Sequence, residues 1–171
     1  MLYRRAIQTT DPLTTLFSHH LWANLRLLEC CAGLNTAQLD ATIPGAYGSI
    51  RETLEHFVYS EKSYFSRFNT GTIYHRPRDV PPLTLDEMKA SLLATGSGFV
   101  EWAPKVQAGD TVEIDWHGTL RQIPRAILLT QAINHATEHR AQIMAILTNI
   151  GVESPDLQAW AYFEELLEKE A

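Results

Sequence analysis

Apolar residues recur at steps of three or four positions in four long stretches of the chain, which predicts four amphipathic helices. Capping and stop signals place these helices at about residues 12–31, 49–70, 84–106 and 124–150. The start signals are an N-cap followed by proline and two capping boxes: Asp11-Pro12, Ser49 with Glu52, and Thr84 with Glu87. On the first helix, the predicted inward arc runs from Leu13 and Leu16 through Phe17 to Cys31.

The stretch between the second and third helices contains several turn-forming residues. Gly71 and the prolines at 77, 81 and 82 mark a long connection, so helices two and three need not be tight antiparallel neighbours. Alternating apolar residues between 110 and 123 predict a small two-stranded ribbon, and Ser154-Pro155 is predicted to cap a short acidic helix that runs to the C-terminus. The predicted fold is all-α: a four-helix bundle with a long crossover connection, in a single domain spanning 1–171.

Composition excludes several classes of function. The 171 residues carry a net charge of −6 and no Lys/Arg cluster, which argues against a nucleic-acid partner. No apolar run approaches the length of a membrane span, and Met1–Arg5 do not lead into the apolar core of a signal peptide, so we expect a cytoplasmic protein. The only cysteines, Cys30 and Cys31, are adjacent and lack the spacing of zinc ligands.

His135 and His139 stand four residues apart in the fourth predicted helix, so both imidazoles lie on one face. They occupy the centre of that helix's apolar arc. A single histidine there is usually a hydrogen-bonded core residue. Two stacked imidazoles are harder to satisfy without a cation, because an unpartnered buried polar group costs a few kcal/mol. The pair therefore predicts half of a metal site.

A third ligand has to come from a facing helix. His75 lies among prolines and His117 in a predicted turn, so we expect both to be exposed. His56 lies on the polar flank of the second helix, where periodicity alone predicts partial exposure and leaves its role as a ligand open.

Three segments resemble the DinB-like metalloproteins, a family that also includes mycothiol-dependent maleylpyruvate isomerases and bacillithiol transferases. They are Trp22–Arg26, Gly48–His56 and His135–Gln142, and the resemblance covers nearly the whole chain in the same order. It implies a four-helix bundle in which His56, His135 and His139 hold a divalent metal. It also favours a homodimer.

The chain departs from the family pattern at His19 and His20, where Tyr-Asn is frequent, and at Ala141, where glycine is frequent. His20 and Asn24 fall on the inward arc of the first helix. They could line the pocket, hydrogen-bond a metal-bound water or add a ligand; a polar pair in the core is an equal alternative. Trp22 faces the opposite side, which predicts cover by the C-terminal helix or a subunit interface.

Three further residues belong to the fourth-helix motif. Glu138 could orient His135 or a neighbouring helix, or form a surface salt bridge with Arg140 or Arg121. Arg140 and Gln142 are carried by the motif without an assigned role.

Three neutral imidazoles leave a coordination position open, which is typical of catalytic rather than structural sites. The ion could lower the pKa of a bound water for hydrolysis or hold a thiol as thiolate. The resemblance implies the latter, with a low-molecular-weight thiol and a small-molecule substrate. We expect zinc or nickel, although iron and manganese also accept imidazoles. The alternatives are a peptidase, from the His-x-x-Glu-His pattern, and a non-catalytic metal or small-ligand binder in stress response.

Overall fold

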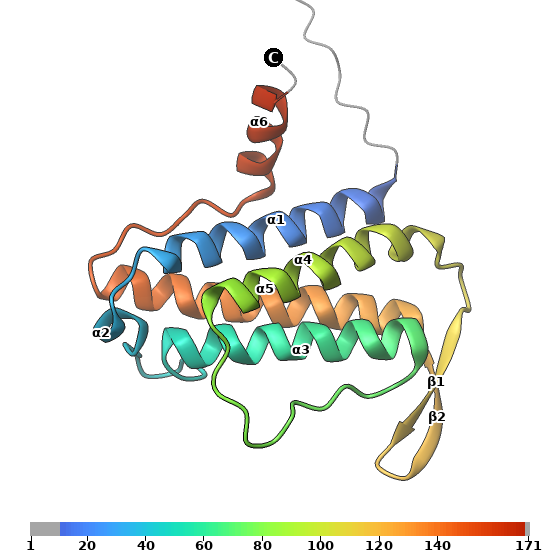
Figure 1. Ribbon diagram of the computed structural model, residues 1–171. Helices are drawn as coiled ribbons and strands as arrows, with labels where there is room; N and C mark the ends of the chain where they lie inside the picture. Colours follow the sequence, from blue (N-terminus) through green and yellow to red (C-terminus); the bar gives the residue numbers. More distant parts are fainter. Residues whose placement is uncertain (1–10, 170–171) are drawn as a thin grey trace, which may run out of the picture.

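Four long helices lie side by side in the computed structural model, which describes residues 11–169 (Figure 1). They are α1 (Pro12–Ala32), α3 (Ile50–Thr70), α4 (Leu85–Trp102) and α5 (Arg125–Asn149). The predicted all-α bundle is confirmed. The expectation drawn from Met1–Arg5 lies outside the described residues. Within residues 11–169, no helix combines the length and the apolar character that a membrane crossing requires.

The order of the helices explains the long connection. α1 packs chiefly against α4, and α3 against α5, and in each pair the chain runs in opposite directions (Figure 1). α3 and α4 run in the same direction, so residues 71–84 have to return along the length of the bundle (Figure 1). The predicted crossover is thus confirmed, and it forms an extended strap beside α3.

The predicted caps form at the starts of three helices. The Asp11 carboxylate accepts from the backbone of Leu13 and Thr14. Complete capping boxes begin the other two, Ser49 with Glu52 at α3 and Thr84 with Glu87 at α4. Each such cap contributes about 1 kcal/mol to helix stability.

Three details of the helix predictions were wrong. The third helix ends at Trp102 rather than near 106, and a 3₁₀ turn, Ala103–Lys105, follows. Pro104 is the physical reason, since it lacks an N–H and its ring clashes with the carbonyl four residues earlier. Leu16, predicted to face inward, is 42% exposed.

The predicted cap at Ser154-Pro155 does not form. The last helix begins at Ala159, and the Ser154 hydroxyl donates instead to the Met144 carbonyl at 3.1 Å.

The glycines of α4 do not interrupt the helix. A Cβ on Gly96 would lie 2.5 Å from the Leu21 side chain of α1, and one on Gly98 would collide with the Phe65 ring of α3. Both glycines therefore permit close approach of neighbouring helices, at a modest cost in helix propensity.

Three small elements complete the fold. They are α2 (Thr36–Leu39), the antiparallel ribbon of β1 (Thr111–Trp116) and β2 (Thr119–Pro124), and α6 (Ala159–Lys169). The ribbon turns at His117-Gly118, whose φ angles of 55° and 82° suit a two-residue hairpin. Its buried residues, Val112 and Ile114, pack into the bundle as expected for a hairpin too small to be stable alone.

The short C-terminal helix α6 stands apart from the bundle axis (Figure 1). It covers Trp22, whose Nε1 donates to Glu165 at 2.8 Å and whose ring lies 5.4 Å from that of Tyr162. Of the two expectations for Trp22, cover by the C-terminal helix is the one that this structure forms.

The hydrophobic core is divided along the bundle axis into two clusters. One contains Leu27, Leu54 and Ile143 among others, and the second contains Phe17, Phe68 and Phe99. Between them lies a layer in which each long helix contributes buried polar side chains: His20 and Asn24, Glu61, Thr95, and His139 with Arg140. This polar layer lies at mid-height of the bundle and includes His139, one of the predicted metal ligands.

Candidate metal centre

Three imidazoles from two helices converge on the α3–α5 side of the polar layer. His135 and His139 lie one turn apart on the same face of α5, with their Nε2 atoms 3.2 Å apart. His56 reaches across from α3 and brings its Nε2 to 3.2 Å from that of His135. The ligand atoms of all three residues lie within 4.8 Å of one another. The three predicted ligands are thus brought together, and they could hold a metal ion.

The spacing of these nitrogens fits a cation. Two imidazole nitrogens bound to one zinc ion at tetrahedral angles lie about 3.4 Å apart, given Zn–N bonds of about 2.0–2.1 Å. The two closest separations here are 3.2 Å. A neutral imidazole carries only one N–H, so three rings facing one point cannot all be satisfied by each other. The donor set therefore suits a divalent transition metal.

Gln142 sets the protonation pattern of one ring. Its Oε1 accepts from the backbone N–H of Tyr47 at 3.3 Å and lies 2.9 Å from His139 Nδ1. Because an oxygen that accepts from Tyr47 can only accept from the ring as well, His139 Nδ1 carries the proton. The lone pair is then on Nε2, which faces the other two imidazoles. Such a partner orients a metal-binding histidine and makes it a better ligand.

Burial keeps two of the rings neutral. It lowers the pKa of His135 from 6.5 to about 4, together with a smaller effect of the neighbouring imidazoles of His139 and His56. Burial and, to a smaller extent, His139 also lower the pKa of His56. A depressed pKa keeps a lone pair available at neutral pH, and the neutral form is the one that binds a metal.

Aromatic side chains border the centre. The Tyr47 ring stacks on His56 at a centroid distance of 4.0 Å, and the Tyr64 ring meets His135 edge-on at 5.4 Å. His139 is buried, whereas His56 and His135 are half-buried, as the flank position of His56 predicted. The centre is thus reached from one side, past His56 and Tyr47.

A cleft of about 580 Å³ opens beside His56, between α3 and the crossover segment. Arg76 of the crossover pairs with Glu55 at 2.9 Å, and its guanidinium lies 4.9 Å from the centre of the Tyr59 ring. The lining residues combine phenols, hydroxyls and charges: Tyr47, Glu52, Glu55, His56, Tyr59, Ser60, Ser63, Tyr74 and Arg76. A cleft of this size accommodates a small molecule.

Glu138 does not take part in this site. Its side chain is exposed, and no hydrogen bond or ion pair of its carboxylate is found within residues 11–169. Neither expected role is formed: it orients no ligand, and it makes no salt bridge with Arg140 or Arg121. The reason is its direction, about 100° around α5 from His139. His75 and His117 are exposed, as expected.

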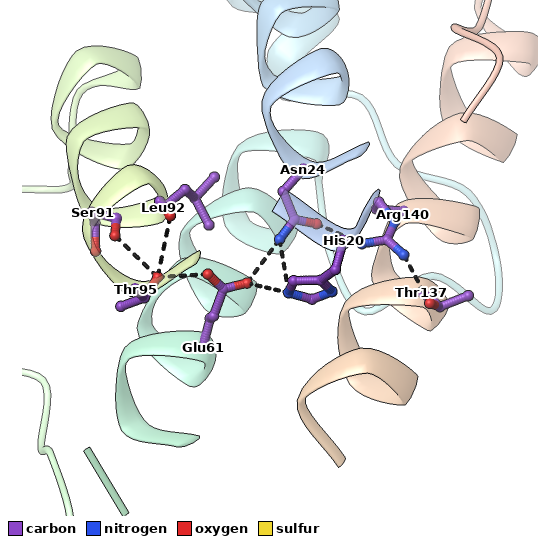
Figure 2. A network of polar contacts seen from close by, with 8 residues as sticks. All are labelled: His20, Asn24, Glu61, Ser91, Leu92, Thr95, Thr137 and Arg140. Carbon is purple, nitrogen blue, oxygen red and sulfur yellow. Dashed lines mark hydrogen bonds and ion pairs between the residues drawn. The ribbon is translucent and has the colours of Figure 1, made fainter. Parts of the chain in front are cut away.

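His20 and Asn24 face inward as predicted, but their partners lie in the core (Figure 2). His20 Nε2 and Asn24 Nδ2 both donate to Glu61 Oε2, at 2.8 and 2.7 Å, and Thr95 Oγ1 donates to Glu61 Oε1 at 2.5 Å. Arg140 donates to Asn24 Oδ1 at 2.6 Å and to Thr137 Oγ1 at 2.8 Å. Of the alternatives open for His20 and Asn24, this is the core polar pair, extended across four helices.

Sequence reasoning missed Glu61, which is only 2% exposed. The signal was present, because Glu61 lies four residues after Phe57 and four before Phe65, within the apolar arc of its helix. A carboxylate in that position requires partners. Arg140, left without a role, is one charge that compensates it.

The fold and the three convergent histidines place this chain among helical-bundle proteins with a candidate metal site between two antiparallel helices. The chain belongs to the DinB family, whose family model matches residues 8–169. A comparison with curated proteins finds no match.

Two solved structures share the fold. A DinB-like protein from Bacillus cereus is 19% identical, with 82% of this chain and 94% of that chain covered and a TM-score of 0.58. A DinB-like protein from Bacillus subtilis is 13% identical, with 84% and 97% covered and a TM-score of 0.59. At these identities the likeness concerns the fold alone.

Proposed function

We propose that the protein binds one divalent transition-metal ion through His56, His135 and His139 and is a metal-dependent enzyme that joins a thiol to a small electrophile. The observation that carries this proposal is the convergence of three imidazole nitrogens beside an open cleft. Three protein ligands leave a position for a guest, which is the arrangement of catalytic rather than structural sites. When bound, the ion supplies Lewis acidity that favours the anionic form of a thiol or water.

The residues around the centre have separate tasks in this proposal. Gln142 holds the lone pair of His139 towards the ion site. Tyr47 covers the outer face of His56 and limits access of water. Arg76 and Tyr59, held together in the cleft, offer a charge and a flat aromatic surface to a small-molecule substrate.

The carboxylates near the cleft favour thiol transfer over hydrolysis. Glu55 accepts from Arg76 and from the backbone of Leu83, both at 2.9 Å, and Glu52 caps α3. Among the described residues that line the cleft, these are the carboxylates, and both serve the fold. A hydrolase benefits from a free general base beside the metal, whereas a thiol bound to a cation ionises without one. A peptidase of the His-x-x-Glu-His type would need Glu138, which points into solvent.

The partners follow from the same proposal. A low-molecular-weight thiol and a small electrophile are the substrates, with neither nucleic acid nor membrane as a partner. We further propose a homodimer, which sedimentation equilibrium tests through a mass twice the 19.3 kDa of the chain.

Metal analysis is the first test. After loading with zinc or nickel and removal of the excess, we expect one ion per wild-type chain and less than a tenth of that in His139→Ala, because two imidazoles do not hold the ion. His75→Ala is the matched control, since His75 is an exposed histidine distant in sequence from the three ligands. Equal metal content in wild type and His139→Ala contradicts the proposed site.

Activity is the second test. The loaded protein should consume a thiol and monochlorobimane together, and His139→Ala should not. Turnover of an ester or amide without any thiol would instead identify a hydrolase. Metal binding with neither activity would identify a non-catalytic binder and contradict the enzymatic part of the proposal.

A further inference from the structure

We infer that the buried network of His20, Asn24, Glu61, Thr95 and Arg140 is a positioning device for the metal centre, which holds α3 and α5 in the register that lets His56 meet His135 and His139. The inference rests on the proposed function, because it assigns the network a role at the same centre. None of the five residues lines the cleft, and none hydrogen-bonds to a ligand nitrogen; they act through the helices that carry the ligands.

The network residues lie close to the ligands on α3 and α5. Glu61 follows His56 by five residues on α3, which places it about 140° around the helix and about 7.5 Å, or about 1.4 turns, along it. Arg140 is the neighbour of His139 on α5, about 100° around that helix and at nearly the same height. Each helix therefore presents a ligand on its outer side and a network residue on its inner side, within about one and a half turns. A shift of the inner residue displaces the ligand by a similar amount.

Asn24 of α1 links Glu61 of α3 to Arg140 of α5, which share no hydrogen bond with each other in the network (Figure 2). Its Nδ2 donates to Glu61 Oε2 of α3 at 2.7 Å, and its Oδ1 accepts from Arg140 Nη1 of α5 at 2.6 Å. The Asn24 amide thus donates at its nitrogen and accepts at its oxygen. Because both hydrogen bonds are directional, they fix the position of Glu61 along the bundle axis relative to that of Arg140. Two threonines complete the series of hydrogen bonds: Thr95 donates to Glu61 at one end, and Thr137 accepts from Arg140 at the other.

Apolar packing and the polar layer constrain this register differently. The two apolar clusters lie on either side of the polar layer, and their hydrophobic contacts are non-directional, so they define the height of α3 against α5 less sharply than hydrogen bonds do. Hydrogen bonds are directional, and a buried carboxylate that loses its donors is costly. Glu61 accepts three hydrogen bonds while 2% exposed. A slip of α3 would break them together.

Both ends of the Arg140 guanidinium are held in place. Nη1 donates to Asn24 Oδ1 at 2.6 Å and Nη2 donates to Thr137 Oγ1 at 2.8 Å. A metal ligand has to be held within about 0.5 Å of its productive position. The network between the two ligand-bearing helices leaves one buried atom, His20 Nδ1, without a hydrogen-bond partner within residues 11–169. Its remaining directional contacts are suited to that tolerance.

Two variants test the inference. Asn24→Ala removes the link between Glu61 and Arg140. Glu61→Gln keeps the size of the side chain but replaces one accepting oxygen by an NH₂ group, which then faces the donors of the network. Leu92→Ala is the control: Leu92 is 1% exposed in α4, so truncation of its side chain lowers the melting temperature through a cavity. The substitution keeps the Leu92 backbone carbonyl, which accepts from Thr95 Oγ1 at 3.5 Å. Glu61→Gln keeps the test decisive if Asn24→Ala does not fold.

Two readouts separate positioning from stability. Zinc affinity, measured by competition with a chelating dye, should fall at least about 10-fold in both network variants and stay within about 2-fold of wild type in Leu92→Ala. The visible absorption of the cobalt-substituted protein, which reports ligand geometry, should change in the network variants only. Wild-type affinity and spectrum in both network variants would overturn the inference.

A metal-free measurement distinguishes this inference from the proposed function. In crystal structures without metal, the His56–His135 Nε2 separation of 3.2 Å should lengthen by about 1 Å in the network variants and stay unchanged in Leu92→Ala. An unchanged separation in the network variants overturns the inference. Failure of the wild-type protein to bind any metal would overturn the proposed function, and the lengthened separation would still be observed if the network sets the register.

Discussion

Histidines occur in two contrasting settings within one polar layer of this bundle. On the inner side, His20 meets a carboxylate and an amide, and the donors and acceptors of that network largely match (Figure 2). On the outer side, three imidazoles face one another beside an open cleft, and their nitrogens cannot all be satisfied by each other. The two settings contain the same residue type but differ in the partners that surround it. Polar groups with matching donors and acceptors stabilise a core, whereas convergent lone pairs require a cation.

The largest effect should come from breaking the inner network. Replacing Glu61 by Leu leaves three donors without an acceptor and the Arg140 charge uncompensated, which should lower the free energy of unfolding by about 3–5 kcal/mol. Urea unfolding of the metal-free protein measures this. In the outer centre, His56→Leu should cost less than about 1 kcal/mol under the same conditions, because His56 is half-buried. Equal losses in both variants would remove the distinction between the two settings.

The next effect concerns Gln142, which serves the outer centre alone. Gln142→Ala removes the acceptor of His139 Nδ1–H, and we expect metal affinity to fall by about 10–100-fold. Gln131→Ala is the matched control, an exposed glutamine of α5 whose one side-chain hydrogen bond within residues 11–169 is donated to the Tyr64 hydroxyl. Isothermal titration with zinc compares them, and equal affinities would show that the tautomer of His139 does not depend on Gln142.

The pH dependence of the metal-free protein provides a smaller effect. His135 is neutral in the fold, where burial lowers its pKa from 6.5 to about 4, so the unfolded chain binds the proton more tightly. Its contribution is complete above pH 6.5 and is lost as the pH falls towards 4. With allowance for solvent screening of a half-buried group, the loss is about 1–2 kcal/mol. His135→Gln should flatten this part of the profile; an unchanged slope would assign it to other groups.

The smallest effect should come from Glu138. Its carboxylate is exposed and makes no hydrogen bond within residues 11–169, so Glu138→Gln should change the free energy of unfolding by less than about 0.5 kcal/mol. Metal affinity should also stay within about 2-fold of wild type. A loss of metal or of turnover in this variant would restore the role that its place between two ligands suggested.

Local signals predicted most of the fold. Capping boxes at Ser49 and Thr84 and the turn at His117-Gly118 depend on neighbours within a few residues, and all three form as expected. The end of α4 was misplaced because the apolar pattern continues past Pro104, although proline stops the α-helix there. Leu16 was misplaced because an apolar residue at the edge of an arc is buried only if a neighbouring element covers it.

The candidate site was predictable to a lesser degree. Periodicity placed His135 and His139 on one face, but the wheel position of His56 left it undecided, and only the family resemblance selected it. The carboxylate partner of His20 could not be predicted from the sequence either, because it lies on another helix. Glu61 is distant from His20 in the sequence, and which residue of a facing helix lies at a given height depends on how the two helices are aligned.

The sequence by itself determined the helices, their inward faces and the stacked histidine pair, because these follow from periodicity and capping within one segment. Only the tertiary structure decided that His56 meets that pair while His20 is directed to Glu61 and the core. The physical reason is that both outcomes depend on the relative height and rotation of separate helices, which packing and long-range hydrogen bonds set and no single segment encodes.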